Sequence, residues 1–229
     1  YEYITENCLL NEEELLAERA YADSLYTRAR KMDVKEGTDI TELLVNADMS
    51  KPNFEGWNPT AAITSNFNSA MGEEKFRVAQ AFNTKFELSQ VVTDIPDGLY
   101  RLELNGLYRA ATSEDTDESP VVLYINDFES PVKNINSEPQ PEETAEDSVN
   151  CFITNAGTWP YDNVTNGGYV PNSVYGCSFA FMGGRYKQTV YGLVTGGNMT
   201  IGLRDPREVK DAQGWTVFTN FRLTYMAKN

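Results

Sequence analysis

The sequence contains no histidine, and this absence excludes more chemistry than any other feature of its composition. Without an imidazole, Ser-His and Cys-His nucleophilic catalysis are unavailable, and most protein zinc sites are lost as well. Cysteine is nearly as scarce: Cys8, Cys151 and Cys177 cannot all pair with one another, and none has the close spacing of a metal site. We favour buried free thiols, while a Cys151 to Cys177 bridge stays open.

Positive charge and long apolar runs are also in short supply. The chain has 19 Lys and Arg against 34 Asp and Glu, which gives a net charge of −15. A chain this acidic repels phosphate backbones and anionic lipids, so we expect neither nucleic acid nor a membrane surface as a partner. No apolar run approaches the roughly 20 residues that cross a bilayer, so membrane insertion is not expected either. The 229 residues, 41% of them hydrophobic, are enough to bury a real core.

The N-terminal part of the sequence predicts a helix over about residues 9–32. Three consecutive glutamates, Glu12, Glu13 and Glu14, lie where the dipole of such a helix favours negative charge. We therefore expect an N-terminal helical segment over residues 1–38 that packs against another surface, followed by a second domain over residues 39–229. The apolar residues of the segment recur at helical spacings: Leu10, Ala17, Tyr21, Leu25, Ala29 and Met32.

The second domain has the pattern of a β protein. Its last segment, residues 215–226, is apolar at the odd positions except for Thr219, and this period of two predicts a strand with one face on the core. Further short segments of this kind, separated by turn signals, predict an all-β sandwich or jelly roll. They are residues 41–46, 61–67, 75–82, 85–92, 99–110, 121–125, 188–195 and 198–204.

Several of these segments carry motifs that occur together in one family. They include Asn53-Phe54-Glu55-Gly56-Trp57, residues 86–90 (FELSQ), residues 97–102 (DGLYRL) and residues 169–173 (YVPNS), followed by the closing strand. In this order they resemble galactose-binding-like β-sandwich domains, similar to carbohydrate-binding modules, of secreted Bacteroidetes proteins. The resemblance covers about residues 40 to 226. It implies a jelly roll of roughly eight or nine strands, often an accessory module of glycan-degrading systems in secreted, periplasmic or cell-surface proteins.

The same resemblance raises the question of a structural calcium ion. In many relatives the closing strand reads Trp-x-x-x-Asp-Asn-Phe, and its Asp helps to hold calcium. Here Thr219 stands in that place, and a hydroxyl is a poorer ligand for a hard cation than a carboxylate. The calcium implied by the family is therefore in doubt, with Asp48 and Glu55 as its candidate ligands.

A loop over residues 155–172 is our first candidate for ligand binding. Trp159, Tyr161 and Tyr169 lie there among amides such as Asn163. A flat ring covers the apolar face of a sugar while amides satisfy the sugar hydroxyls, so this composition suits a carbohydrate partner. The alternative is a loop that packs its own rings onto the sandwich.

A second candidate for ligand contacts lies at the end of a predicted strand. Tyr108 and Arg109 stand just before the acidic run that begins at Ser113, close to where a loop rim is expected. The alternative for Arg109 is a surface ion pair with Glu114 or Asp115.

These features together predict a non-catalytic carbohydrate-binding module of a secreted or cell-surface protein. The alternative is a structural or protein-interaction domain of a larger surface protein that contacts other domains, with the N-terminal helix as a docking element. A glycosidase that uses two carboxylates is less favoured. The sequence lacks the Glu-Xaa-Asp-Xaa-Xaa-Glu motif of jelly-roll glucanases, and it is short for a TIM barrel.

Overall fold

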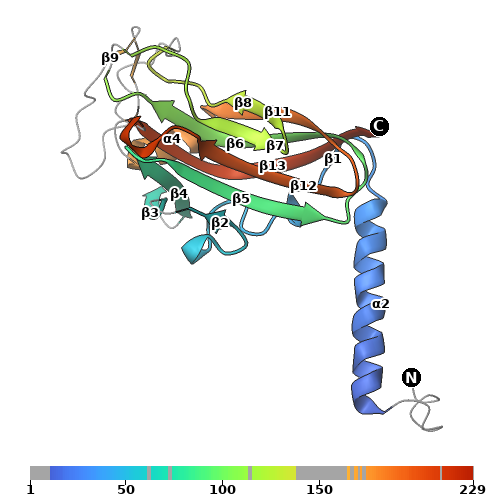
Figure 1. Ribbon diagram of the computed structural model, residues 1–229. Coiled ribbons are helices and arrows are strands. Elements are labelled where there is room, and N and C mark those ends of the chain that lie inside the picture. Colours follow the sequence, from blue (N-terminus) through green and yellow to red (C-terminus); the bar gives the residue numbers. More distant parts are fainter. Residues whose placement is uncertain are drawn as a thin grey trace.

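The protein consists of a two-sheet β-sandwich and a long helix that projects from one end of it (Figure 1). In Figure 1 the N-terminal helix points away from both sheets, and the C-terminus lies near the end of the helix that joins the sandwich. The computed structural model describes residues 11–60, 63–71, 74–112, 115–137, 164–165, 168–169, 171, 174–211 and 213–228.

The first sheet has six antiparallel strands. Its order is β11-β6-β13-β4-β3, and β1 pairs with the far part of β13. The bounds are β1 Thr38–Asp39, β3 Thr64–Met71, β4 Glu74–Phe82, β6 Gly98–Arg109, β11 Lys187–Val194 and β13 Trp215–Lys228.

The second sheet has five antiparallel strands in the order β2-β5-β12-β7-β8. Its bounds are β2 Asn58–Pro59, β5 Phe86–Thr93, β7 Val122–Ile125, β8 Phe128–Pro131 and β12 Asn198–Asp205. The remaining elements are helices α2 (Glu12–Met32) and α4 (Val174–Met182), the short helices η1 (Thr41–Leu43), η2 (Pro52–Phe54) and η3 (Val209–Asp211), and the pair β9 (Val164–Thr165) and β10 (Gly168–Tyr169).

The core lies between the two sheets, and β6 shows how the sequence fills it. Tyr100, Leu102 and Leu104 face the second sheet and are at most 2% exposed, while Arg101 and Glu103 between them are only partly buried. The predicted alternation is therefore confirmed for this strand. The predicted all-β sandwich with an N-terminal helix is confirmed as well.

The closing strand departs from the alternation that its sequence predicts. Thr219 lies opposite Asn105 and Arg222 lies opposite Glu103, so β13 takes three steps where β6 takes two. This is a β-bulge, and it holds Asn220 at a φ of 54°. Asparagine is one of the few residues that adopt this left-handed conformation readily.

The bulge reverses the faces of β13 halfway along the strand. Before it, Trp215 and Val217 lie in a hydrophobic cluster outside the sandwich; after it, Leu223 and Tyr225 lie in the core between the sheets. The odd positions of this strand therefore do not share one face, and that part of the prediction is wrong.

One other prediction is corrected by the structure. Residues 41–46 form η1 and a turn rather than a strand, and Asn46 has a φ of 56°, which ends any extended pairing. Helix α4 was not expected from the sequence. Its residues are apolar on all sides, so they show no helical period.

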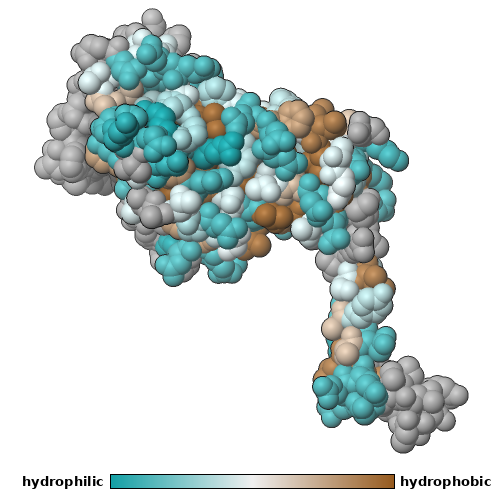
Figure 2. All heavy atoms as spheres, viewed as in Figure 1, coloured by the Kyte–Doolittle hydropathy of each residue, from teal (hydrophilic) through white to brown (hydrophobic). Residues whose placement is uncertain are grey.

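Helix α2 is confirmed, but not its expected packing. Asn11 and Glu14 form a capping box: Glu14 N donates to Asn11 Oδ1 (3.0 Å), and Asn11 N donates to Glu14 Oε2 (2.8 Å). Figure 2 shows hydrophobic and hydrophilic residues along the projecting helix, which is clear of the sandwich. Leu16 is 56% exposed and Tyr26 is 66% exposed, so these side chains of the helix do not pack on the described residues of the sandwich.

Candidate functional site

The outer faces of the two sheets, which point away from the core, differ in how much of them is open. On the second sheet, the ring of Tyr124 lies over Gly202, because a side chain at Gly202 would meet the Tyr124 hydroxyl at 2.6 Å. That hydroxyl donates to Glu87 Oε1 (2.8 Å), and the Arg204 guanidinium covers the ring at 4.7 Å while it pairs with Glu129. Tyr124 is 3% exposed, so the part of this face around Gly202 is closed by its own side chains.

The outer face of the first sheet is closed over one half only. Helix α4 packs there and buries Cys177 and Phe181 against Leu107 of β6 and Trp215 of β13. Cys177 is a free thiol with no exposed surface, and burial raises its pKa. Cys8 and Cys151 lie outside the described residues, so the expectation about them stays a prediction.

The other half of this outer face forms a hollow of about 420 Å³. Its floor is made by β6 and β13, where Glu103 lies opposite Arg222 and Asn105 lies opposite both Thr219 and Lys187 of β11. The segment from Thr41 to Asp48 forms one wall, and Gly184 in the turn after α4 forms another. The lining residues are Thr41, Ala47, Asp48, Glu103, Leu104, Asn105, Gly184, Lys187, Asn220, Phe221 and Arg222.

The polar groups of the hollow are partly engaged with one another. Asn105 Nδ2 donates to the Arg185 carbonyl (3.2 Å), and Asn220 Nδ2 donates to Asn105 Oδ1 (3.4 Å). Glu103 Oε2 pairs with Arg101 Nε at 3.1 Å. Within the described residues, Lys187 of this hollow forms no ion pair.

An acidic side chain stands close to the hollow, on β1. Asp39 accepts a hydrogen bond from the Thr41 backbone amide (2.9 Å). Hydrogen bonds from Thr41 lower the pKa of Asp39, and the positive charges of Arg222 and Arg101 lower it further. The outer face therefore carries charges of both signs, held on regular strands rather than on loops.

An exposed aromatic ring lies on the same sheet face as the hollow, further along β11. Tyr191 of β11 is 50% exposed and is the register partner of Arg101. It shares its face of the strand with Lys187 and Thr189, because side chains two residues apart lie on the same face. Paired residues on neighbouring strands bring their Cβ atoms to within about 5 Å, so these two side chains start from neighbouring positions.

The sequence reasoning missed Tyr191, although the signal was present. Residues 187–194 alternate cleanly, and the face away from the core carries Lys187, Thr189, Tyr191 and Leu193. A tyrosine on the solvent face of a strand, among polar side chains, is a candidate for ligand contact. The prediction instead concentrated on aromatic residues in a loop.

Most of the predicted loop residues cannot be placed against this site. Trp159, Tyr161 and Asn163 lie outside the described residues. The backbone of Tyr169 is described in β10, where it pairs with Val164 of β9. Their role in ligand binding stays a prediction.

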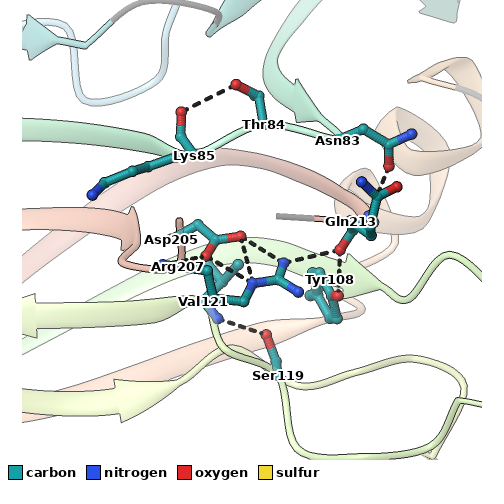
Figure 3. Close-up of polar contacts among 10 residues, drawn as sticks. Asn83, Thr84, Lys85, Tyr108, Ser119, Val121, Asp205, Arg207 and Gln213 are labelled. Carbon is teal, nitrogen blue, oxygen red and sulfur yellow. Dashed lines mark hydrogen bonds and ion pairs between the residues drawn. The ribbon is translucent and has the colours of Figure 1, made fainter. Parts of the chain in front are cut away.

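Tyr108 lies inside a cluster of loops at one end of the sandwich (Figure 3). It is 4% exposed, and its hydroxyl donates to the Gln213 carbonyl (2.8 Å). Its ring lies 5.8 Å from the Arg207 guanidinium and against Gly214, where an added Cβ would come within 2.6 Å of the ring. Burial raises the pKa of Tyr108, partly offset by the charge of Arg207. Tyr108 therefore helps to hold these loops in place.

The same cluster contains a buried acid. Asp205 is 3% exposed and accepts two charge-assisted hydrogen bonds from Arg207, at 3.0 Å from Nε and 2.7 Å from Nη2. Arg207 Nη2 also donates to the Gln213 carbonyl (2.9 Å), the same oxygen that accepts from Tyr108. Asp205, Arg207 and Tyr108 thus hold the connection between β12 and β13 in place (Figure 3).

Arg109, the other residue expected near the loop rim, lies on the outer face of the first sheet. Its guanidinium is 5.0 Å from the centre of the Trp215 ring, a cation–π distance. The alternative partner Glu114 lies outside the described residues. Arg109 and Tyr108 are consecutive on β6, so they project from opposite faces and do not form one site.

The surroundings of Thr219 do not fit a calcium ion. Its hydroxyl, fully buried, donates toward the carbonyl oxygens of Asp48 (3.1 Å) and Arg77 (2.9 Å). A calcium ion would need these oxygens as its own ligands, and a hydroxyl directed at them supplies no negative charge. The described residues hold no cluster of three or more acidic, histidine or cysteine side chains.

The two candidate calcium ligands have other interactions. The Asp48 carboxylate accepts from the Ser50 amide (3.1 Å), and Glu55 pairs with Lys51 (3.0 Å). Both side chains are exposed. A calcium site that uses Asp48 and Glu55 stays a prediction.

Comparison with known proteins gives distant structural likenesses only. No protein-family model matches the chain, and no curated protein sequence matches it either. The chain is similar to the structure of TmCBM61 in complex with β-1,4-galactotriose, with 14% identity, 80% of this chain and 97% of that chain covered, and a TM-score of 0.37.

Two further likenesses are of the same order. The CBM22-1 xylan-binding domain of Paenibacillus barcinonensis Xyn10C has 10% identity over 86% of this chain and 99% of its own, with a TM-score of 0.41. A cyclase from Fischerella sp. TAU has 14% identity over 85% of this chain and 100% of its own, with a TM-score of 0.42. A binding protein and an enzyme thus score alike, and at these scores neither carries an argument about function.

Proposed function

We propose that the protein binds a carbohydrate chain across β11, β6 and β13, on the open half of the outer face of the first sheet. The observation that carries this proposal is the half-exposed ring of Tyr191 on the same sheet face as a polar hollow. A sugar ring has an apolar face that stacks on an aromatic side chain and hydroxyls that need hydrogen-bond partners. Tyr191 offers the first, and the hollow offers the second.

The chemistry of the hollow suits hydroxyl groups. Asn105 and Asn220 supply amides that both donate and accept, Glu103 and Asp48 supply acceptors, and Lys187 supplies donors. A volume of about 420 Å³ lies within the range of small-molecule sites. Because the floor is built on hydrogen-bonded strands, these groups are held in place before a ligand arrives.

The motifs that resemble carbohydrate-binding modules support the same function. They imply a secreted, periplasmic or cell-surface protein, and we extend the proposal to that setting. No helix within the described residues is both long enough and apolar enough to cross a membrane. The loop residues Trp159, Tyr161, Asn163 and Tyr169 remain candidates for additional contacts with the same glycan.

The binding proposal is tested by titrating a panel of soluble polysaccharides by calorimetry. The panel contains neutral and uronate-bearing glycans, because the hollow carries carboxylates as well as Lys187 and Arg222. We expect at least one glycan to bind, and we expect Tyr191→Ala and Asn105→Ala to weaken that binding. Phe128→Ala is the matched control, because Phe128 is an exposed ring (45%) on β8 of the other sheet. No binding by any glycan, or equal loss in the control, contradicts the proposal.

We propose binding without hydrolysis, and this part has its own test. A glycosidase needs two carboxylates about 5 to 9 Å apart in an open cleft, and Asp48 and Glu103 both line the hollow. Glu103 is paired with Arg101, whereas a catalytic acid must release and recover a proton. We expect no release of reducing ends from any bound glycan. Hydrolysis that disappears in Glu103→Gln would show an enzyme instead.

A protein-interaction role is the second candidate, and helix α2 favours it. The proposed glycan site on the first sheet includes no residue of this helix. Its exposed apolar side chains need a separate explanation.

A further inference from the structure

The hollow on the first sheet contains two cations that form no ion pair with the residues the structure describes. Lys187 of β11 and Arg222 of β13 both line the hollow, and both are exposed. The ion pairs within the described ranges include neither side chain. Arg222 acts on Asp39 at longer range, since its charge helps to lower the pKa of that carboxyl. Two positive groups of the hollow are therefore open to a ligand.

The carboxylates of the hollow, in contrast, already accept from donors of the chain. Glu103 Oε2 pairs with Arg101 Nε at 3.1 Å. The Asp48 carboxylate accepts a hydrogen bond from the Ser50 amide at 3.1 Å. A carboxylate that has a donor of its own gains less from a ligand than a cation that has no counter-charge in contact. The charge that the hollow offers to a ligand is thus mainly positive.

The strand register places the two cations on either side of the central strand of the hollow. The order of the strands is β11-β6-β13, with Lys187 paired with Asn105 of β6 and Arg222 paired with Glu103 of β6. Asn105 and Glu103 are two residues apart, so they share one face of β6. A ligand that lies across β6 at this point can reach both cations and the Asn105 amide, which both donates and accepts hydrogen bonds.

A neutral sugar would leave these cations without compensation. A ligand that covers a charge removes water from it, and this desolvation is unfavourable unless the ligand supplies an opposite charge. A carboxylate or sulfate group on a sugar supplies that charge, and its hydrogen bonds with Lys187 and Arg222 are stronger than bonds between neutral groups. The hydroxyls of the same sugar can bond to the amides of Asn105 and Asn220, which also line the hollow.

The charge of the whole protein limits how many acidic groups the ligand carries. At a net charge of −15, the protein repels a dense polyanion. In about 0.1 M salt, charges that are more than roughly 10 Å apart are largely screened. A single acidic group in the hollow therefore interacts mainly with the two cations, whereas further acidic groups along the ligand would meet an acidic surface. The exposed ring of Tyr191, further along β11, suits a neutral sugar.

We propose that the hollow binds an acidic sugar of a mainly neutral glycan, with the carboxylate or sulfate group of that sugar held by Lys187 and Arg222. Neutral sugars of the same glycan extend along β11 toward Tyr191. This inference rests on the proposed function, because it names the class of glycan that the same site takes.

The first test compares matched glycans by calorimetry with the full chain. Two of them are glucuronoxylan and a glucuronate-bearing arabinogalactan, each native and after reduction of its carboxylates to alcohols. A lightly sulfated galactan and the same galactan without sulfate form the third pair, which separates sulfate from carboxylate as the source of the charge. In at least one pair, we expect the acidic member to bind about tenfold more tightly than the neutral member, which corresponds to about 1.4 kcal/mol.

The possible outcomes separate this inference from the proposed function. Equal affinity for the acidic and neutral members, with Tyr191→Ala weakening both, overturns the acidic sugar but leaves glycan binding in place. Absence of binding by every glycan contradicts the proposed function itself. Polygalacturonate, in which every sugar is acidic, should bind more weakly at low salt than the sparsely charged glycan. If it binds more tightly, the mainly neutral character of the ligand is wrong.

The second test removes the two cations one at a time. Lys187→Gln and Arg222→Gln should each weaken binding of the acidic glycan about threefold or more, and each should leave its neutral counterpart within about twofold. Lys228→Gln is the matched control, because it removes one exposed positive charge from β13 outside the hollow. Near-ultraviolet circular dichroism checks that each variant is folded. Wild-type binding of the acidic glycan by both variants, or an equal loss in the control, would contradict the proposal.

Discussion

The loop cluster around Tyr108 and the sheet face that carries the hollow and Tyr191 are both rich in polar groups, and they treat those groups in opposite ways. In the loop cluster, Asp205, Arg207 and Tyr108 bond to one another and to one backbone carbonyl, and Asp205 is 3% exposed. Around the hollow, Tyr191 is half exposed and Lys187 has no ion-pair partner among the described residues. In the loop cluster the polar groups hold the chain in place, whereas around the hollow some of them are exposed to solvent.

This difference distinguishes polar groups that support the fold from polar groups open to a ligand better than residue type does. Each region has a tyrosine on the first sheet with an arginine close by. A buried polar group without a partner is costly, so a buried cluster must satisfy itself and has little left for a ligand. In an exposed cluster, water can bond to the polar groups, so they can remain without a protein partner at little cost in free energy until a ligand binds. Substitutions should therefore lower stability in the loop cluster and lower binding at the hollow.

The largest effect is expected for Asp205→Ala. It leaves the Arg207 guanidinium without its carboxylate in a region that is mostly buried, since the Arg207 side chain is 26% exposed. Breaking such a pair costs about 3 kcal/mol, the lower end of the range for buried pairs. We expect this loss in the free energy of unfolding, measured with urea.

Glu55→Ala is the control for that measurement. It breaks the ion pair with Lys51, which is a single contact between side chains that are 59% and 50% exposed. An exposed pair contributes well under about 1 kcal/mol. If both substitutions cost the same, burial is not what distinguishes the two kinds of pair.

Alkaline pH should act on a partly buried tyrosine, Tyr186, between α4 and the hollow. Burial raises the pKa of Tyr186 to about 12, from an ordinary value of 10.0. Above pH 10 the unfolded chain loses this proton while the folded chain keeps it, so stability falls as pH rises from 10 to 12. Two pH units correspond to at most about 2.7 kcal/mol.

The alkaline effect is measured as the free energy of unfolding at pH 9, 10.5 and 12, with tyrosinate absorbance followed in parallel. Tyr186→Phe should lose less stability than the wild type over this interval. Burial also raises the pKa of Tyr124 and Tyr100, so part of the dependence should remain in the variant. An unchanged slope in Tyr186→Phe would show that this residue does not contribute.

The fold was predictable where local patterns agree with packing. Strand β6 has one covered face and one largely polar face, so its alternation gives its bounds to within one residue. The helix at residues 12–32 was predictable from its spacing, yet the exposure of its described apolar side chains was not. Spacing shows which face is apolar but not what covers it.

The closing strand shows why other parts could not be predicted. Its odd positions are apolar on both sides of the bulge, but α4 covers Trp215 and Val217, whereas the second sheet covers Leu223 and Tyr225. A strand whose two halves are covered by different elements, with a one-residue bulge between the halves, has the same apolar alternation in its sequence as a regular strand covered by one element. The candidate residue Tyr191 was overlooked for a related reason, because the prediction looked for rings in loops and Tyr191 lies on a strand.

A smaller effect in free energy is expected at the hollow, for Tyr191→Ala. Loss of a stacked ring costs roughly 1 kcal/mol or more, so affinity for a bound glycan should fall at least about fivefold. The free energy of unfolding should change by less than about 0.5 kcal/mol, because the side chain is half exposed. A stability loss as large as that of Asp205→Ala would place Tyr191 among the supports and remove the distinction between the two regions.

The smallest effect is expected for calcium. The hydroxyl of Thr219 already bonds toward the carbonyls of Asp48 and Arg77, so this place is satisfied without a cation. Adding millimolar calcium, or removing it with a chelator, should shift the midpoint of thermal unfolding by less than about 1 °C. A binding cation stabilises the folded state in proportion to the logarithm of its concentration over Kd. A rise of several degrees that disappears in Asp48→Asn and Glu55→Gln would therefore establish the predicted site and show that part of the exposed surface is organised by a metal.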